Sequence, residues 1–394
     1  MKTLFSFAFL YLSLSAFGQK PLLIHDLVNF SLDSMFITAH DSTLLRDELP
    51  HYKPSGVAFA PLDTALPTSN LINGSNFTLK ERVAPVFDQT EFPIGTSVKI
   101  FLWHNDSLVH NCSGSMVSRT HVLTAAHCIS EIPSHDLFAD SILIKPAYDN
   151  GMIAQGFDSV WVSKAYHYRD WDINGEDIAL LELTEPLGNQ TGYIGVGFES
   201  VDSVFAEGLY YKFPYPHTSI LPIDSNSYNG DTLYYQYGQV NHFLGKFVGI
   251  MNGFAMPGES GSSLMRVDGT SSFVSYGTLT WSSFVRHTRL DNRTFHAIKA
   301  VIADDLVGLD EEVVELLDGL EVFPNPATDE VRIRLTENGA IESVELFSVT
   351  GAKVLERAKP GRDLGLDLSG LPRGMYLLRV EAAERVGIRK VILR

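Results

Sequence analysis

Three side chains, far apart in the sequence, could together activate an alcohol for attack on a carbonyl carbon. Ser260 lies in a turn flanked by glycines, residues 258–263, which lifts its hydroxyl out of an apolar context. A serine alcohol is a poor nucleophile near neutral pH, so it needs a base and a carboxylate that orients the base. His127 ends one hydrophobic segment and Asp177 begins another, and these residues supply both groups. The sequence therefore indicates nucleophilic acyl transfer.

The elements that would position these side chains are short β-strands separated by turn residues. A first set of predicted strands covers residues 97–103, 109–117, 121–124, 142–144, 160–163 and 178–183. A second set covers residues 193–198, 209–213, 232–237, 243–250, 261–265 and 273–281. Residues 294–304 carry apolar side chains at helical spacing and predict a terminal helix.

The order of the three residues in the chain, His127 before Asp177 before Ser260, resembles that of the chymotrypsin-like serine peptidases. The resemblance covers residues 93–305 and implies an all-β fold of two six-stranded antiparallel barrels, with the site in the cleft between them. It also implies that Ser260 is the nucleophile, that His127 is the base and that Asp177 fixes the imidazole tautomer. The backbone N–H groups of Gly258 and Ser260 would form the oxyanion hole.

The chain has two cysteines, Cys112 and Cys128, and both lie near the candidate base. In an exported protein two cysteines favour a disulfide, and closing this loop would stabilise the fold by about 3 kcal/mol. A metal site is the alternative, but Cys112, His121, His127 and Cys128 do not supply enough ligands while His127 does chemistry. The resemblance also implies the disulfide, because the family pairs the cysteine after its histidine with one on the preceding strand.

The resemblance also suggests where the side chain of the substrate's P1 residue would bind. The predicted pocket residues are Phe254, Ala255, Thr280, Trp281, Ser282 and Asp291. Phe254 stands where trypsin-like enzymes carry an acidic residue, so we expect an apolar P1 residue. Asp291 leaves open an alternative, since its carboxylate could reach the pocket floor and bind Arg or Lys. Leu279 stands where glutamate-specific relatives carry a histidine, which argues against an acidic P1 residue.

The residue before the nucleophile departs from the family pattern. It is Glu259, where trypsin-like members have aspartate, and the chain lacks the Ile-Val-Gly-Gly start that supplies their buried ammonium. Two partners for Glu259 remain open at this stage. One is a new N-terminus, such as Val83 after cleavage at Arg82, and the other is a group elsewhere in the chain.

The sequence predicts further segments on the N-terminal side of the catalytic region. Residues 1–18 have a positive start, an apolar run and small residues before a cleavage site, as in a secretory signal peptide. The apolar run is shorter than the roughly 18 residues that a membrane-spanning helix needs, so we expect no stable membrane span. Residues 19–92 show no sustained periodicity. We interpret them as a pro-segment or an N-terminal extension, with a small independent domain as the alternative.

The C-terminal part is patterned separately. An acidic linker, residues 306–320, leads to short strands and turns over residues 321–394, which predict a small β-sandwich. The sequences FPNP at 323–326, LPRGMY at 371–376 and RKV at 389–391 resemble the C-terminal sorting domain of the type IX secretion system of Bacteroidetes. The resemblance implies the type IX machinery as a partner and the cell surface or the medium as the destination. A sugar-binding sandwich is the alternative.

Composition excludes several classes of partner. The chain of 394 residues carries a net charge of −17, which argues against nucleic acid and anionic membranes. No motif calls for a cofactor or a metal, and the expected partner is a protein or peptide substrate. A secreted serine endopeptidase is the leading interpretation. A catalytically silent homologue that binds surface ligands and an esterase are the alternatives.

Overall fold

The computed structural model describes residues 20–36, 43–132, 134, 136–217, 228–269, 272–281, 285–306, 320–335, 340–348, 353–361, 363–382 and 385–394. The chain divides into two compact units, Met1–Leu306 and Val307–Arg394. The predicted signal peptide and nearly all of the predicted linker lie outside the described residues. None of the helices in the described ranges has the length and hydrophobicity needed to cross a membrane.

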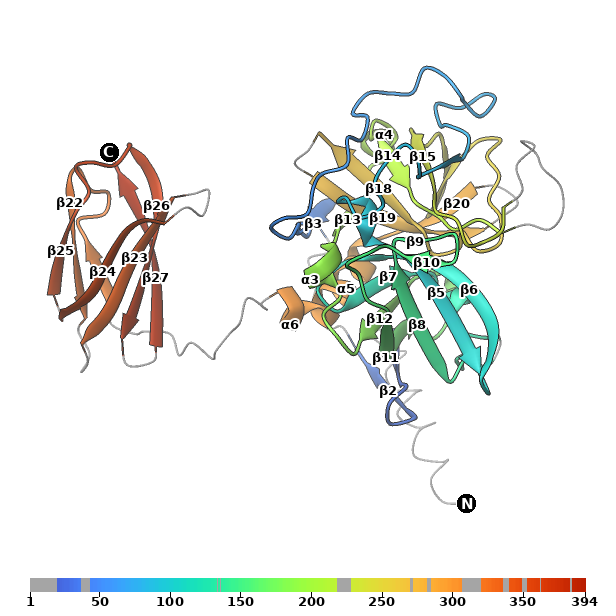
Figure 1. The fold of residues 1–394 in the computed structure, drawn as a ribbon, viewed down its shortest axis with the longest axis horizontal. Helices are drawn as coiled ribbons and strands as arrows, with labels where there is room; N and C mark the ends of the chain where they lie inside the picture. The colour runs from blue at the N-terminus through green and yellow to red at the C-terminus, as the bar shows by residue number, and fades with distance from the viewer. Residues whose placement is uncertain are drawn as a thin grey trace. The chain divides into compact units, whose positions relative to one another are not determined.

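Six strands of the first unit close into a barrel (Figure 1). They are β5 (Ser97–His104), β6 (Ser107–Met116), β7 (His121–Thr124), β8 (Ser141–Pro146), β11 (Val160–Tyr168) and β12 (Ala179–Leu183). The pairing of β11 with β12 closes the ring, and every pair is antiparallel. The predicted first set of strands is confirmed, because alternating apolar residues such as Val98, Ile100 and Leu102 face a fully buried core.

A second sheet in the same unit is open. Its strands are β13 (Gly195–Glu199), β14 (Tyr210–Lys212), β15 (Tyr234–Gly238), β16 (His242–Leu244), β17 (Phe247–Ile250), β18 (Ser263–Asp268), β19 (Ser272–Trp281) and β20 (Val285–Arg289). The path runs β16-β17-β20-β19-β18-β14-β15, and β13 pairs with β19. The predicted chymotrypsin-like fold is confirmed as a closed barrel plus a half-barrel. β20 was not predicted, because its sequence VRHTR is mostly polar, and residues 243–250 form a hairpin where one strand was expected.

Short elements complete the described part of this unit. The helical ones are η2 (Ile94–Thr96), η3 (Ala126–Cys128), α2 (Trp171–Asn174), α3 (Gly188–Thr191), α4 (Asp202–Ala206), α5 (Asn292–Val301) and α6 (Ala303–Leu306). A small hairpin joins β9 (Tyr148–Asp149) to β10 (Met152–Ile153). The predicted terminal helix is therefore two helices, α5 and α6.

The N-terminal segment shares the sheets and the core of the first unit. β1 (Leu22–Asp26) pairs with β11 and with β2 (Ser31–Met35). β3 (Arg46–Glu48) pairs with β13, and β4 (Glu81–Arg82) pairs with β15. Figure 1 shows this blue segment running from the first barrel to a loop over β14 and β15. Three of its apolar side chains, Phe77, Val83 and Phe92, are fully buried, whereas others such as Phe30 and Val86 are exposed.

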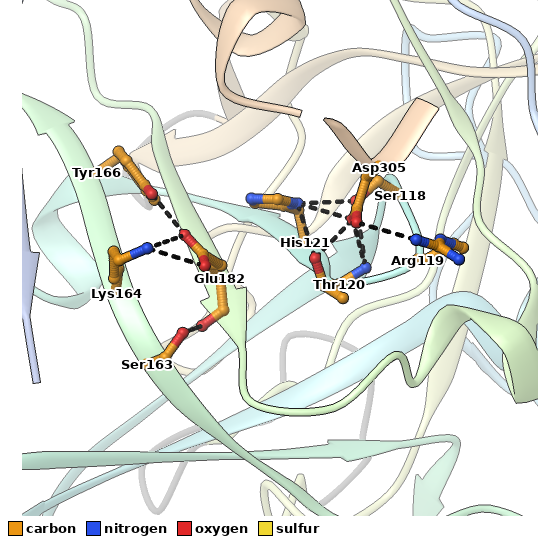
Figure 2. Close-up of polar contacts among 9 residues, drawn as sticks. All are labelled: Ser118, Arg119, Thr120, His121, Ser163, Lys164, Tyr166, Glu182 and Asp305. Carbon is orange, nitrogen blue, oxygen red and sulfur yellow. Dashed lines mark hydrogen bonds and ion pairs between the residues drawn. The ribbon is translucent and has the colours of Figure 1, made fainter. Parts of the chain in front are cut away.

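A polar cluster attaches α6 to the turn before β7 (Figure 2). The Oδ2 atom of Asp305 accepts hydrogen bonds from the Ser118 hydroxyl at 2.5 Å, the Thr120 amide at 2.7 Å and the Thr120 hydroxyl at 2.6 Å. It also lies 3.0 Å from Nδ1 of His121. Burial alone would raise the pKa of the Asp305 carboxyl, but the hydrogen bonds from His121, Ser118 and Thr120 hold it well below its usual 3.8. The fold therefore favours the ionised carboxylate.

Replacing Asp305 by asparagine should destabilise the first unit by about 1–3 kcal/mol near pH 7, because the variant loses charge-assisted hydrogen bonds. A depressed folded pKa stabilises the fold above the unfolded pKa, and this contribution is lost as the pH falls toward the folded pKa. The difference should therefore shrink below pH 3.8. Tryptophan fluorescence during urea unfolding measures it, since all four tryptophans lie in the first unit. Asp158→Asn, at an exposed residue paired with Gln190, is the control. Equal stability of Asp305→Asn and the parent chain near pH 7 would contradict the prediction.

The second unit contains two sheets around a core of its own. β21 (Leu320–Phe323), β22 (Glu330–Leu335) and β25 (Asp363–Asp367) form one sheet. β23 (Ile341–Ser348), β24 (Lys353–Gly361), β26 (Gly374–Ala382) and β27 (Arg385–Leu393) form the other (Figure 1). Val331, Val344 and Val380 are fully buried in the shared core. β24 is a strand although charged residues and a proline interrupt its alternating pattern.

Candidate active site

His127 and Asp177 form the centre of the candidate site. His127 lies in η3, directly after β7, and Asp177 lies just before β12, which pairs with β7. Asp177 Oδ2 lies 2.6 Å from His127 Nδ1, and Asp177 Oδ1 accepts the His127 backbone N–H at 2.8 Å. The same carboxylate therefore fixes both the ring and the backbone of the histidine. This geometry assigns the proton to Nδ1 and leaves Nε2 as the acceptor.

The carboxylate also changes the acidity of the histidine. Burial lowers the pKa of His127, but the charge of Asp177 and its hydrogen bond outweigh burial, so the pKa lies above its usual 6.5. Asp177 is itself 5% exposed. A buried carboxylate beside a partly exposed imidazole stabilises the imidazolium that a general base becomes.

Thr280 has a role that the sequence did not indicate. Its hydroxyl donates a short hydrogen bond to Asp177 Oδ2, and the neighbouring Thr278 hydroxyl donates to the Asp177 carbonyl at 3.3 Å. Thr280 was predicted as a pocket wall, whereas its described hydrogen bond orients the carboxylate. The signal was weak, because a threonine in a β-strand is common for reasons of propensity alone.

The turn that carries Ser260 is fixed by its carbonyl groups. The Pro257 carbonyl accepts from the His217 amide at 2.7 Å, and the Gly258 carbonyl accepts from the Ser113 hydroxyl at 2.7 Å. The Ser260 carbonyl accepts from the Ser113 amide at 2.8 Å. Among the described residues, the backbone N–H groups of Gly258 and Ser260 have no acceptor. These two amides are the donors of the predicted oxyanion hole, which stays a prediction.

The nucleophile turn lies against the segment that leads to His127. A Cβ added to Gly261 would come within 2.1 Å of Thr124 Oγ1 and 3.0 Å of the Ala125 nitrogen, so only glycine fits there. No hydrogen bond joins the Ser260 hydroxyl to His127 among the described residues. Such bonds are often long without substrate and shorten in the reacting complex.

The predicted disulfide between Cys112 and Cys128 is confirmed. The two Cα atoms lie 6.1 Å apart, a separation typical of a disulfide. The bond ties β6 to the residue after His127. Because Ser113 follows Cys112 and bonds both Gly258 and Ser260, the disulfide links the base to the support of the nucleophile turn. No group of three metal-ligating side chains occurs within the described ranges.

The other predicted pocket residues have different environments and roles in the structure. Phe254 is 41% exposed and Ala255 is buried beside it. Asp291 is the N-cap of α5, where its carboxylate accepts the Thr294 amide at 2.8 Å and lies 3.6 Å from Lys246 Nζ. Its carboxylate is thus committed to a helix cap. Ser282 and the side chain of Trp281 lie outside the described residues.

A cavity of about 400 Å³ opens beside the candidate base. The residues that line it are His127, Ile132, Trp171, Asp172, Gly175, Asp177, Phe247, Thr280 and Arg286. Sequence reasoning missed most of them, because they lie on loops, a short helix and strands that only the fold brings together. The cavity leaves His127 accessible from its open side.

Comparison with known proteins shows the family of this chain. Residues 88–295, more than half of the chain, match the family model described as Trypsin. The chain belongs to the trypsin family. It is similar to chymotrypsin-C of Rattus norvegicus, at 29% identity over 84 residues, covering 21% of this chain and 30% of that protein. It is also similar to glutamyl endopeptidase of Bacillus licheniformis, at 30% identity over 97 residues, covering 24% and 30%. These matches span under a third of the length of the curated relatives.

Two further similarities complete the comparison. A solved structure titled "Structure of Glu endopeptidase in complex with MPD" aligns with a TM-score of 0.45 and 16% identity, covering 57% of this chain and 96% of that one. Residues 321–394 match the model described as Secretion system C-terminal sorting domain. This domain indicates type IX secretion and export to the cell surface or beyond.

Proposed function

We propose that this protein is a secreted serine endopeptidase that cleaves peptide bonds through an acyl-enzyme. The observation that carries the proposal is the Asp177 carboxylate, which holds both the ring and the backbone of His127 beside the Ser260 turn. Family membership supports a peptidase, and two amides without acceptors on either side of Glu259 support stabilisation of an oxyanion.

Each residue would act at a defined atom. His127 Nε2 takes the proton of the Ser260 hydroxyl as the oxygen attacks the substrate carbonyl, and later returns it to the leaving amine. Asp177 keeps the other ring proton on Nδ1 and stabilises the imidazolium. The amides of Gly258 and Ser260 donate to the oxyanion of the tetrahedral intermediate. Water then releases the acyl group by the same steps.

The structure favours an apolar P1 residue over a basic one. A basic P1 side chain in an apolar slot needs a buried anion, or it bears a desolvation cost of several kcal/mol. Asp291, the one candidate for that anion in the predicted pocket, caps α5 instead. We therefore expect P1 residues with medium or large apolar side chains.

A fluorophosphonate probe tests the function and this preference together. The purified protein should hydrolyse casein, mass spectrometry should locate the probe on Ser260, and hydrolysis should fall in proportion to labelling. The casein fragments should end mainly in apolar residues. Activity without labelling of Ser260 would contradict the mechanism. Cleavage after Arg or Lys would contradict the apolar preference, and hydrolysis of esters but not of casein would favour an esterase.

We propose that the C-terminal domain, residues 321–394, is a sorting signal and that the peptidase unit does not need it for activity. A chain ended after residue 318 should keep its casein activity, because the tail has its own core and its own sheets. In a host with a type IX system the shortened chain should remain in the periplasm, whereas the full chain reaches the medium or the surface. Immunoblots of the cell fractions measure this. Export of the shortened chain would exclude the sorting role.

A further inference from the structure

A buried charge cluster lies directly behind the nucleophile. Glu259 immediately precedes Ser260 in the chain and is fully buried. Its Oε1 atom lies 3.1 Å from Lys80 Nζ and accepts the Met256 amide at 2.7 Å. Its Oε2 atom lies 3.5 Å from Lys212 Nζ. Buried carboxylates persist in proteins when they are paired and hydrogen-bonded, and both oxygens of Glu259 meet this condition.

Lys80 is the member of this cluster that comes from the N-terminal segment. Its side chain is 5% exposed, and its ammonium also donates to the Phe254 carbonyl at 2.7 Å. One ammonium therefore holds the chain at two points before the nucleophile, Phe254 and Glu259. The ammonium form of Lys212 is less favoured. Burial and the nearby Lys80 lower the pKa of Lys212 to about 8, although the charge of Glu259 opposes this shift. Lys80 is also the closer of the two lysines to the Glu259 carboxylate, at 3.1 Å against 3.5 Å for Lys212.

The residues around Lys80 are built into the second sheet. Thr78 donates its amide to the Tyr237 carbonyl at 2.9 Å, and Val83 donates its amide to the Leu233 carbonyl at 3.0 Å. Phe77 and Val83 are fully buried. The Val83 nitrogen is therefore engaged in the sheet, and Glu259 already has two lysine partners. This geometry does not favour a new N-terminus at Val83 as the partner of Glu259.

Glu176, which precedes the candidate catalytic residue Asp177, also forms an ion pair with a lysine of the N-terminal segment. Glu176 precedes Asp177, is 2% exposed and lies 2.9 Å from Lys20 Nζ. Lys246 at 2.6 Å and Arg293 in a shorter contact bind its other oxygen. The N-terminal segment thus contacts the residue before the carboxylate and the residue before the nucleophile.

We propose that residues 20–92 are retained in the active enzyme and that Lys80 is a positioning residue, which holds the nucleophile turn in its reactive form through Glu259. The inference rests on the proposed function. In this proposal the Lys80 side chain supplies the cation that pairs with Glu259. The enzyme therefore needs no cleavage before the catalytic domain to create an N-terminal ammonium for this role. Removal of Lys80, by mutation or by processing, releases the turn that aims the amides of Gly258 and Ser260.

Three variants test this role. Lys80→Met should lower kcat on a peptide amide by about 10²-fold with little change in KM, as expected when an oxyanion donor is misplaced. Lys80→Arg keeps a cation and should recover most of kcat. Lys53→Met is the matched control in the same segment, because the described contacts of Lys53 are with the nearby carbonyls of Pro54 and Val57 and with the Phe59 ring. If Lys80→Met does not fold, Lys80→Gln replaces it, because its amide removes the charge but keeps a hydrogen-bond donor beside Glu259 and leaves the Lys212–Glu259 pair intact.

Two measurements keep the inference separable from the proposed function. Hydrogen exchange followed by mass spectrometry should show faster exchange over residues 254–262 in Lys80→Met than in Lys53→Met, and this readout does not require activity. The intact mass of fluorophosphonate-labelled protein from the native medium should include Lys80. Three outcomes would each overturn the inference: an unchanged kcat in Lys80→Met, unchanged exchange over this turn, or a labelled species that begins at Val83 or later. Failure of the parent chain to react with the probe or to cleave casein would instead count against the proposed function.

Discussion

Replacing Asp177 by asparagine is expected to lower kcat on peptide amides by about 10⁴-fold, because the substitution puts the imidazole in the wrong tautomer. Asp177 Oδ1 accepts the backbone N–H of His127, whose direction is fixed. The asparagine oxygen must take that place, since an NH₂ group there would face another donor. The NH₂ group then points at His127 Nδ1 and donates to it, so the ring proton moves to Nε2. A protonated Nε2 cannot accept the proton of Ser260.

Thr280 makes this outcome more certain. Its hydroxyl donates to Asp177 Oδ2, but a hydroxyl can rotate and accept from an amide instead. The threonine therefore does not oppose the asparagine orientation that inverts the tautomer. The variant should keep the fold, because shape and burial of the side chain are conserved.

The pH dependence of kcat/KM provides the second readout of the same variant. His127 must be neutral to act as a base, and its pKa is raised above 6.5, so activity of the parent chain should rise through a midpoint above pH 6.5. Without the carboxylate, burial alone acts on the imidazole and the midpoint should move downward. Asp140→Asn, at an exposed aspartate of the same barrel that binds the Asn105 amide, is the control. A loss below tenfold in Asp177→Asn would contradict the role assigned to this carboxylate.

Much of the fold could be predicted because its signals are local. β-Rich runs between turn residues located the strands of the first barrel, and the two cysteines located the disulfide. β20 was not predicted, because its side chains are mostly polar and its pairing with β17 and β19 stabilises the strand. A strand between two others is fixed by tertiary hydrogen bonds, which sequence periodicity does not report.

The support of the site was harder to predict than the site itself. His127, Asp177 and Ser260 stand in motifs that chemistry constrains. Thr280 contacts Asp177, and Lys80 contacts Glu259 and Phe254, from distant parts of the chain. Lys80 lies 179 positions before Glu259, in a segment without periodicity. Only the fold shows that an apparently featureless segment supplies a buried cation. Asp291 is a different case, because an aspartate just before the predicted helix at 294–304 is a recognised N-cap signal, and the structure shows this cap.

Replacing Gly258 by alanine is expected to lower kcat by about 10²–10³-fold, with a smaller change in KM. Gly258 has φ of +83°, a conformation that costs a residue with a side chain. A Cβ there would lie 2.5 Å from the Tyr215 carbonyl oxygen, a backbone atom that cannot move alone. The turn must therefore shift, and the Gly258 and Ser260 amides shift with it. Since the carbonyl of Gly258 is bound by Ser113, the shift also strains the contact between the two halves of the site.

A second glycine separates this effect from backbone strain. Gly156 has φ of +96° and open space around its Cβ position, so Gly156→Ala bears the conformational cost without the clash. It should lose stability and keep kcat. Steady-state kinetics on a peptide amide, with fluorophosphonate labelling to count reactive Ser260, separates the two variants. If Gly258→Ala keeps kcat within a factor of about three of the parent chain, the Gly258 amide is not part of the oxyanion hole, because a donor lost from that site costs far more.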